Sequence, residues 1–418
     1  MTLTKLGLLV VIFVDVAGQG LIIPIINQLI TAPTSDFLPA QTTESVRHAT
    51  YGLVIGVFYL SWFLGAVYIS KLSDSIGRKN GMLICLAGAL VGYVLTILAI
   101  GWSSLWLMLL GRAITGFTAG NQPIAQAAMA DLSRSDAEKT KNLGAAVAAL
   151  SLGLVAGPLI AGLLSDQRVL GDFASLSLPF YVAIGLVLVA MILIQFYFHD
   201  SLTSRAPLRV KPQEVFLLLW QILQHRTVLR VAAVFFCFML VWNTCYVFLD
   251  AYLTTRFDVG TLGASLAILV SGASLALSSA YLVAPIGQRF SKGKIVIGAA
   301  AVMAASAALF VALPDIVVVF LAIIPLAAAF AVGYATLLSI FSASVSAAEQ
   351  GWVMGVSTAL WTLGAGLTSL LGGDLMGIDL RLPFVLATAS ALGAILLASL
   401  LWSAADVRQI TSRTTADG

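Results

Sequence analysis

Stretches of about twenty apolar residues recur along the whole chain and constrain it more than any other feature. A helix needs about 20 mostly apolar residues to cross the hydrocarbon core of a bilayer. The sequence has 418 residues, of which 60% are hydrophobic and only 10% are charged, whereas soluble domains contain about 25% charged residues. Because no soluble core of this length needs so few charges, the sequence predicts an all-α membrane protein that crosses the bilayer many times.

Twelve such stretches predict twelve transmembrane helices, six on each side of a basic connecting segment. The predicted spans are 6–30, 49–70, 81–101, 104–131, 142–164, 178–198, 228–253, 261–286, 294–312, 315–343, 351–374 and 382–403. The connecting segment contains the breakers Pro207 and Pro212 and the basic residues Arg205, Arg209, Lys211 and Arg226. The expected domains are a first six-helix bundle at 1–198, a cytoplasmic linker at 199–227 and a second six-helix bundle at 228–418.

Lysine and arginine residues lie mostly on one side of these spans. If the N-terminus is cytoplasmic, seventeen of the 22 lie on the cytoplasmic side, and only Arg47, Arg168, Arg256 and Arg381 lie outside. The remaining one, Arg112, lies within a span. Since cytoplasmic loops carry an excess of Lys and Arg, we expect both termini in the cytoplasm and the protein in a bacterial inner membrane. The first span lacks a clear signal-peptide cleavage site, so we expect it to be retained as a helix.

Several classes of site are not indicated. The three cysteines lie in apolar stretches and, with three scattered histidines, have no metal-ligand spacing, so no disulfide, metal or other cofactor is expected. The segment GQRFSKGK, from Gly287 to Lys294, differs from a phosphate-binding loop because five residues separate its glycines and Ile295 stands where Ser or Thr is required. We therefore expect that ATP hydrolysis does not drive the protein. We also expect no nucleic-acid partner and a monomeric protein.

A charged loop joins the second and third predicted spans. It reads KLSDSIGRKNG, in which Gly77 permits a tight turn. An ordinary positive-inside loop is one interpretation. The pattern L-S-D-x-x-G-R-K resembles the loop signature of the major facilitator superfamily. The resemblance implies that Asp74 and Arg78 join Asp131 in a charged latch, which holds the outward-facing state and breaks on inward opening.

The signature is not complete. Ser70 and Ser75 stand where the family usually has Gly and a basic residue. The corresponding loop of the second half, PIGQRFSKGK, keeps Gly287 and Arg289 but has no acidic partner. This second loop is therefore a degenerate copy.

Small residues and a proline recur in the fifth predicted span, GLVAGPLIAG. Gly153, Gly157 and Gly162 allow a neighbouring helix to approach closely, and Pro158 removes one backbone hydrogen bond and bends the helix. A single pair of such glycines would indicate packing alone. The longer string resembles the antiporter signature GxxxGPxxGG, with Ala161 in place of one Gly. Within the superfamily that signature is associated with exporters, mainly the drug:proton antiporters.

The resemblance extends to the tetracycline-efflux branch. The first span, DVAGQGLIIP, resembles the pattern DxxGxGLIxP of that branch, and the segments LWLMLLGRAITG and EQGWVMG match it as well. The branch has an acidic residue just before a Tyr in its third helix, where Gly92 precedes Tyr93 here, and another in its ninth helix, where 294–312 contains none. The resemblance therefore implies the transport scaffold but not tetracycline as the substrate.

Two ionisable residues, Asp15 and Arg112, lie deep in the predicted membrane. Asp15 is about 14 Å from the start of its span at 1.5 Å per residue, near the middle of a core about 30 Å thick, and Arg112 is at a similar depth. A charge there costs at least about 2.5 kcal/mol, so function is the default hypothesis. Burial raises the pKa of a carboxyl group and a nearby arginine lowers it. We expect Asp15 to carry one proton per cycle, and Arg112 to help expel it or to receive a negative group of the substrate. A static Asp15–Arg112 salt bridge is the alternative.

Polar and aromatic residues within the spans are candidates for substrate contact. Gln19 lies one turn from Asp15 and shares its face. The other candidates are Asn121, Gln122, Gln126, Phe238, Trp242, Asn243, Tyr246 and Trp361. For the aromatic residues, packing against lipid or other helices is the alternative, whereas amides in lipid need partners.

These observations predict a major facilitator transporter in which two bundles rock around a central cavity. The expected activity is proton-coupled export of a small amphipathic organic compound. One alternative is a proton-coupled carrier of a metabolite, nutrient or siderophore, including an importer, on the same scaffold. A membrane sensor or lipid-handling protein that transports nothing is the other alternative.

Overall fold

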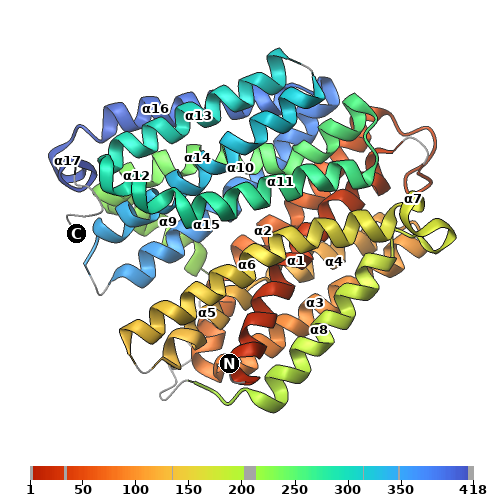
Figure 1. The fold of residues 1–418 in the computed structure, drawn as a ribbon, viewed down its shortest axis with the longest axis horizontal. Helices are drawn as coiled ribbons and strands as arrows, with labels where there is room; N and C mark the ends of the chain where they lie inside the picture. Colours follow the sequence, from red (N-terminus) through yellow and green to blue (C-terminus); the bar gives the residue numbers. More distant parts are fainter. Residues whose placement is uncertain are drawn as a thin grey trace.

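Long helices account for nearly all of the structure. The computed structural model describes residues 3–32, 35–133, 135–201, 213–313, 315–346 and 349–412, and these residues contain no strand. Figure 1 shows two groups of helices, one from the first half of the chain (red to yellow-green) and one from the second half (green to blue). Within the described residues, eleven helices are long and apolar enough to cross a membrane. The protein is a multi-pass membrane protein.

The helix bounds follow the predicted spans closely. The first group is α1 (Leu3–Thr31), α2 (Glu44–Ile76), α3 (Arg78–Gly101), α4 (Leu105–Phe117), α5 (Asn121–Asp131), α6 (Asp136–Ser165), α7 (Gln167–Leu170), the 3-10 helix η1 (Gly171–Phe173) and α8 (Leu178–Tyr197). The second group is α10 (Arg226–Phe257), α11 (Thr261–Tyr281), α12 (Val283–Arg289), α13 (Lys292–Ala312), α14 (Ile316–Ala343), α15 (Gln350–Ile378), α16 (Leu382–Leu401) and α17 (Ala405–Ser412). α9 (Glu214–Gln224) lies between the two groups in the chain.

The predicted span 104–131 is wrong as a single helix. It is divided into α4 and α5, and the backbone between them turns through Thr118, Ala119 and Gly120. Pro123 stands in the first turn of α5, the part of a helix where a missing N–H removes no intrahelical hydrogen bond. The division therefore places the free N–H groups of a helix start within the depth of the membrane.

The predicted linker contains a helix that the sequence analysis missed. α9 reads EVFLLLWQILQ and lies inside 199–227. Its Glu214 forms an ion pair with Lys71 of α2, and its Val215 packs with Phe63 of α2 and Ala359 of α15. The residues Arg205, Arg209 and Lys211 lie outside the described residues. The described part of the linker is thus held against both helix groups.

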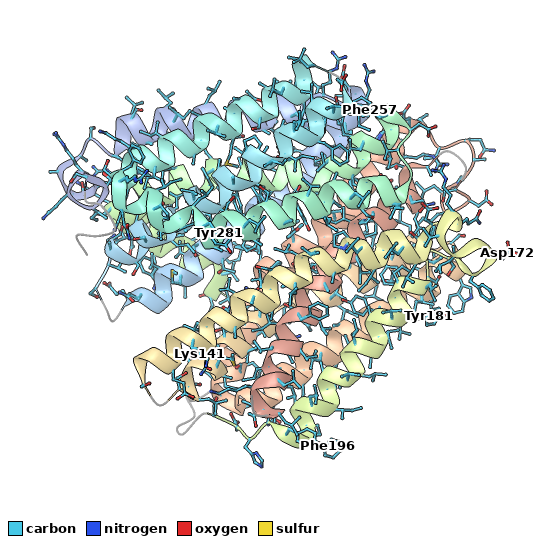
Figure 2. The ribbon with its side chains drawn as sticks, viewed as in Figure 1. Lys141, Asp172, Tyr181, Phe196, Phe257 and Tyr281 are labelled. Atoms are coloured by element: carbon cyan, nitrogen blue, oxygen red, sulfur yellow. The ribbon has the colours of Figure 1, made fainter. Side chains whose placement is uncertain are left out.

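Side chains on the outside of the helices agree with a lipid environment. Figure 2 shows Tyr181 and Phe196 on the outer surface of α8, where they are 56% and 72% exposed. Lys141 and Asp172 lie toward opposite ends of the helices in the same view. Apolar side chains along the helices and charged ones at the ends are the arrangement that a bilayer favours.

Both chain ends are attached to the helices near them. Lys5 at the start of α1 forms an ion pair with Glu138 of α6, at 2.7 Å. Asp406 of α17 accepts hydrogen bonds from the Thr227 hydroxyl, at 2.7 Å, and from Arg230 Nη1, at 2.5 Å. The Thr227 hydroxyl and the Arg230 guanidinium hold the pKa of Asp406 below its ordinary value.

Two sides of the molecule are named after the course of α1. The side at which α1 begins is called the terminal side, and the side at which α1 ends is called the opposite side.

Close packing joins the two groups toward the opposite side. α2 packs on α15, and α6 on α11. A Cβ atom added to Gly373 of α15 would lie 2.9 Å from the Cα atom of Gly52. A Cβ atom on Gly162 of α6 would lie 2.9 Å from the Cβ atom of Ser265. Because α2 starts at the opposite side and α6 ends there, these contacts hold the two groups together at that side.

Candidate functional site

Asp15 faces the start of α5. Its interaction partners are the side-chain amide of Asn121 and the backbone N–H of Gln122. Its side chain is partly exposed, but the Oδ2 atom is buried and has no hydrogen-bond partner. A helix start offers free N–H groups and the positive end of the helix dipole. The division of the fourth span therefore creates a binding place for the Asp15 carboxylate, and its only local sign in the sequence was Pro123, which indicates a bend.

A small cavity of about 20 Å³ lies beside this carboxylate. It has room for about one water molecule. Its lining comes from α1, α2, α3 and α4 and the turn after α4, namely Asp15, Gly18, Gln19, Phe58, Ala89, Tyr93, Arg112, Thr115, Thr118 and Ala119. The sequence analysis selected Asp15, Gln19 and Arg112 from this set, and the structure places them around one cavity.

Arg112 is buried without an ionic partner. It is 3% exposed, and it forms no ion pair with any residue that the structure describes. Its guanidinium carbon lies 4.1 Å from the centroid of the Phe58 ring, a cation–π geometry, and its Nε atom has no hydrogen-bond partner. The static Asp15–Arg112 salt bridge is therefore not formed in this structure. A buried cation with aromatic neighbours and no anion attracts an anionic group.

The packing of Gly92 explains one departure from the tetracycline-efflux pattern. A Cβ atom at Gly92 of α3 would collide with the methyl group of Thr115 and lie 2.9 Å from the carbonyl oxygen of Gly111. No acidic side chain fits there. Tyr93 next to it lines the cavity instead and packs on Phe180 at 6.1 Å between ring centroids. Tyr93 was not selected from the sequence, although its place beside Gly92 was noted.

Aromatic rings connect the two helix groups. Trp62 of α2 lies 5.8 Å from Trp361 of α15, between ring centroids. Trp361 donates from Nε1 to the Asn243 Oδ1 atom at 2.9 Å, and Trp242 stacks on Tyr246 at 5.7 Å. Phe330 and Tyr334 of α14 connect Trp242 to Trp361, so four of the selected residues lie in one cluster, namely Trp242, Asn243, Tyr246 and Trp361.

Other selected residues have different surroundings. Phe238 is fully buried and stacks on Phe330 of α14 at 6.0 Å, so it packs within the second group. Gln126 is partly buried on α5 and does not line the cavity. The sequence analysis missed Phe58, Tyr59, Trp62, Phe330 and Tyr334, which complete the ring contacts. The four-residue spacing of Phe58 and Trp62, and of Phe330 and Tyr334, was the available signal.

The charged loop forms its contacts within the first group. Arg78 Nη1 lies 2.6 Å from Asp74 Oδ1, and Arg78 Nε lies 3.7 Å from Asp131 Oδ2. The backbone N–H of Arg78 also donates to Asp200 Oδ1 at 3.0 Å. Gly77 has φ +103°, and a Cβ atom there would collide with the Asp200 carboxylate. Asp200 is a further member of this charged set that the sequence analysis missed.

The glycines of the fifth predicted span place α6 between α1 and α11. A Cβ atom at Gly153 would lie 2.8 Å from the Phe13 carbonyl oxygen, and one at Gly157 would lie 3.0 Å from the Leu21 backbone N. Pro158 packs on Gly20 of α1, and Gly162 faces α11. The close approach expected of these glycines is present, and its partner on one side is the part of α1 that carries Asp15.

Comparison with known proteins identifies the family. The model described as the Major Facilitator Superfamily matches residues 8–369. The chain belongs to the major facilitator superfamily. This superfamily member is 30% identical to the class D tetracycline resistance protein of Salmonella ordonez. The alignment spans 358 residues, which are 85% of this chain and 85% of that protein.

Solved structures show the same fold. The chain is similar to the human organic anion transporter MFSD10 (TETRAN), with a TM-score of 0.70, 20% identity and coverage of 95% of this chain and 99% of that one. It is also similar to a D-xylose-proton symporter, with a TM-score of 0.72, 15% identity and coverage of 99% and 98%. The predicted all-α, twelve-helix major facilitator fold is confirmed, with α4 and α5 together as one span. The protein is a membrane transporter and not an enzyme.

Proposed function

We propose that the protein exports small amphipathic organic compounds in exchange for protons, by alternating access across a bacterial inner membrane. The observation that supports this most is the cavity shared by Asp15 and Arg112, two ionisable residues in the membrane that form no ion pair. The similarity to a tetracycline resistance protein supports the export direction. The glycines of α6, packed against α1 and α11, support it as well.

Asp15 is the proposed proton carrier. The start of α5 and the Asn121 amide stabilise the ionised carboxylate, whereas a cavity with little water stabilises the protonated form. A movement of α5 relative to α1, or entry of water, changes that balance. A proton that binds from the outer side and leaves to the cytoplasm supplies about 2.3 kcal/mol per 100 mV, before any contribution from pH.

Arg112 and the connected aromatic rings are the proposed substrate contacts. Among the residues that the structure describes, the Arg112 guanidinium has no anionic partner, and it can receive a negative group. The faces of Trp242, Tyr246 and Trp361 suit an apolar or planar part of the substrate, and Gln19 supplies an amide at the cavity. A compound with an anionic group and an aromatic body therefore matches the chemistry of the site.

The two helix bundles, the linker and the latch residues are proposed to carry out the conformational change. We propose that residues 1–198 and 228–418 move as two bundles joined by the linker at 199–227, with both termini cytoplasmic. The terminal side is then the cytoplasmic side. The latch of Asp74, Arg78 and Asp131 opens and closes during this movement.

The test is transport in everted membrane vesicles, with tetracycline as the first probe and a panel of anionic and neutral aromatic dyes beside it. Acidification of the vesicle interior should drive uptake by the wild-type protein. Asp15→Asn should fold and equilibrate the probe but not accumulate it, because Asn cannot carry a proton. Asp172→Asn, an exposed site, is the matched control. Accumulation by Asp15→Asn equal to that of the control would exclude Asp15 as the carrier, and uptake driven in the reverse direction would identify an importer.

A further inference from the structure

A second carboxylate is buried where the two helix groups meet. Asp250 of α10 and Asn27 of α1 are each 1% exposed. Asn27 Nδ2 donates to Asp250 Oδ2 at 2.5 Å and to Thr254 Oγ1 at 2.9 Å, while Asn27 Oδ1 accepts from Thr31 Oγ1 at 2.6 Å. These bonds fix the orientation of the amide, with its N–H groups toward α10. The Asn27–Asp250 hydrogen bond therefore links the two groups directly.

The Asp250 carboxyl group has no positive partner. Its Oδ1 atom has no hydrogen-bond partner, and it forms no ion pair with any residue in the described ranges. A buried carboxylate without a counter-charge is unfavourable, more so at membrane depth. The protonated, neutral form is the one that suits this contact.

The titratable side chains near Asp250, and those at the same end of α2, give it no counter-charge among the described residues. From α2, the Tyr51 phenol, which lies close enough to interact with Asp250 electrostatically, donates instead to the Val247 carbonyl at 2.6 Å. Arg47 donates to the carbonyls at positions 30 and 32. His48 is 1% exposed and neither of its ring nitrogens has a hydrogen-bond partner. From α10 itself, Tyr246 lies one turn away. None of these supplies a cation to Asp250.

The position of the pair makes it part of a gate. Asn27 lies in the last turns of α1, and the Gly52–Gly373 contact of α2 with α15 lies at the same, opposite side of the molecule. Opening that side requires α1 to leave α10, which breaks the Asn27–Asp250 bond and admits water. A hydrated carboxyl group is free to ionise, whereas the dry contact is not.

We propose that Asp250 and Asn27 form a second proton-binding site, which closes the outer gate when Asp250 is protonated. The inference rests on the alternating access and orientation of the proposed function, and is independent of Asp15 and of the substrate. The proton enters the Asp250 carboxylate from outer water as the gate closes, and returns to outer water as the gate opens. It is therefore not transported, and an acidic exterior favours the closed gate.

The test is the width of the outer gate as a function of pH. Val46 of α2 and Ile378 of α15, which are 52% and 76% exposed, are changed to Cys in a full-length chain without native cysteines, and spin-labelled in nanodiscs. Pulsed EPR distances should show the ratio of closed to open gates falling from about pH 5 to about pH 9, by up to about tenfold per pH unit for one linked proton. Asp250→Asn should stay closed throughout, because its side chain cannot ionise.

Controls separate this site from the other titratable residues. Asp15→Asn and His48→Gln should each keep the pH response, and Asn27→Ala should keep it while shifting the ratio toward open gates at every pH. The inference is overturned if Asp250→Asn responds as the wild type does, if the wild type does not respond, or if the response disappears in Asp15→Asn or His48→Gln. If Asp250→Asn does not fold, the Asn27→Ala variant decides the question. A ratio of closed to open gates equal to that of the wild type would then overturn the proposal. The vesicle experiment on Asp15 fails or succeeds independently of this outcome.

Discussion

Asp15 and Asp250 are the same residue type in opposite surroundings. Asp15 meets an amide and a backbone N–H at a helix start and borders a cavity. Asp250 is 1% exposed and meets one amide in a closed contact between the two helix groups, although each carboxyl group has one oxygen atom without a hydrogen-bond partner. Asp15 was predictable because it interrupts the middle of an apolar run. Asp250 was missed because it lies near the end of the predicted span 228–253, where polar residues are ordinary, and because its partner is 223 positions away in the chain.

Arg112→Gln is predicted to impair transport without lowering the thermal stability of the protein. The substitution removes a buried cation that has no ionic partner, and such a charge costs at least about 2.5 kcal/mol at the bilayer centre. We expect the melting temperature to stay equal or rise. Transport of an anionic probe should fall by more than about tenfold, which corresponds to about 1.4 kcal/mol of lost binding. The measurements are thermal unfolding and vesicle uptake.

Arg168→Gln is the control for the loss of one positive charge, since Arg168 lies in the exposed helix α7 and should change neither quantity. A lower melting temperature of Arg112→Gln together with unimpaired uptake would show that Arg112 is a structural residue.

At the level of elements, the glycines of helix α6 differ in how closely neighbouring helices approach them. A Cβ atom added to Gly157 would lie 3.0 Å from the Leu21 backbone N of α1, whereas one added to Gly144, in the same helix, would meet no atom of the described residues within 4 Å. The sequence marks Gly157 as part of the string GLVAGPLIAG, but it does not show which helix Gly157 meets. Contact with α1 decides which of the two is constrained.

Gly157→Ala and Gly144→Ala should therefore shift thermal stability in opposite directions. Extra atoms in a filled contact cost about 1–3 kcal/mol, so Gly157→Ala should lower the melting temperature. Alanine is favoured over glycine in an open helical position by about 1 kcal/mol, so Gly144→Ala should keep or raise it. Equal shifts in both variants would mean that the α1–α6 contact is not close in the working protein.

At the level of the whole molecule, the two helix groups are joined by pairs of helices distant in the chain. A Cβ atom on Gly377 of α15 would lie 2.6 Å from the Ser45 Oγ atom and 2.9 Å from the Ser45 Cα atom. The two backbones lie closer than the Cα–Cα separation usual for a disulfide bond, so a disulfide between these positions forms with a slight outward shift of the two helices. The contact lies at the side that alternating access must open.

A disulfide between Ser45→Cys and Gly377→Cys should stop transport. Under oxidation the bond holds α2 to α15 and keeps that side closed, and a reducing agent should restore uptake to the level of the single variant Ser45→Cys. The measurement is vesicle uptake in parallel with the fraction of cross-linked protein. Full uptake by completely cross-linked protein would show that these helices need not separate.

The sequence alone determined the membrane class, most of the spans, the resemblance to the family and the candidates Asp15 and Arg112. The membrane class and the two candidates follow from the length of apolar runs and from ionisable residues inside them, whereas the family came from the resemblance of the loop KLSDSIGRKNG and of the string GLVAGPLIAG to known signatures. Even the division of the fourth span had a local sign in Pro123, although the position of the break was not predicted.

Only the tertiary structure decided which groups meet. It placed the start of α5 against Asp15, set Arg112 over Phe58 in place of an ion pair, and joined Asn27 to Asp250. The physical reason is that a helix fixes the direction of a side chain only around its own axis, whereas neighbours across helices are set by the packing of segments far apart in the chain.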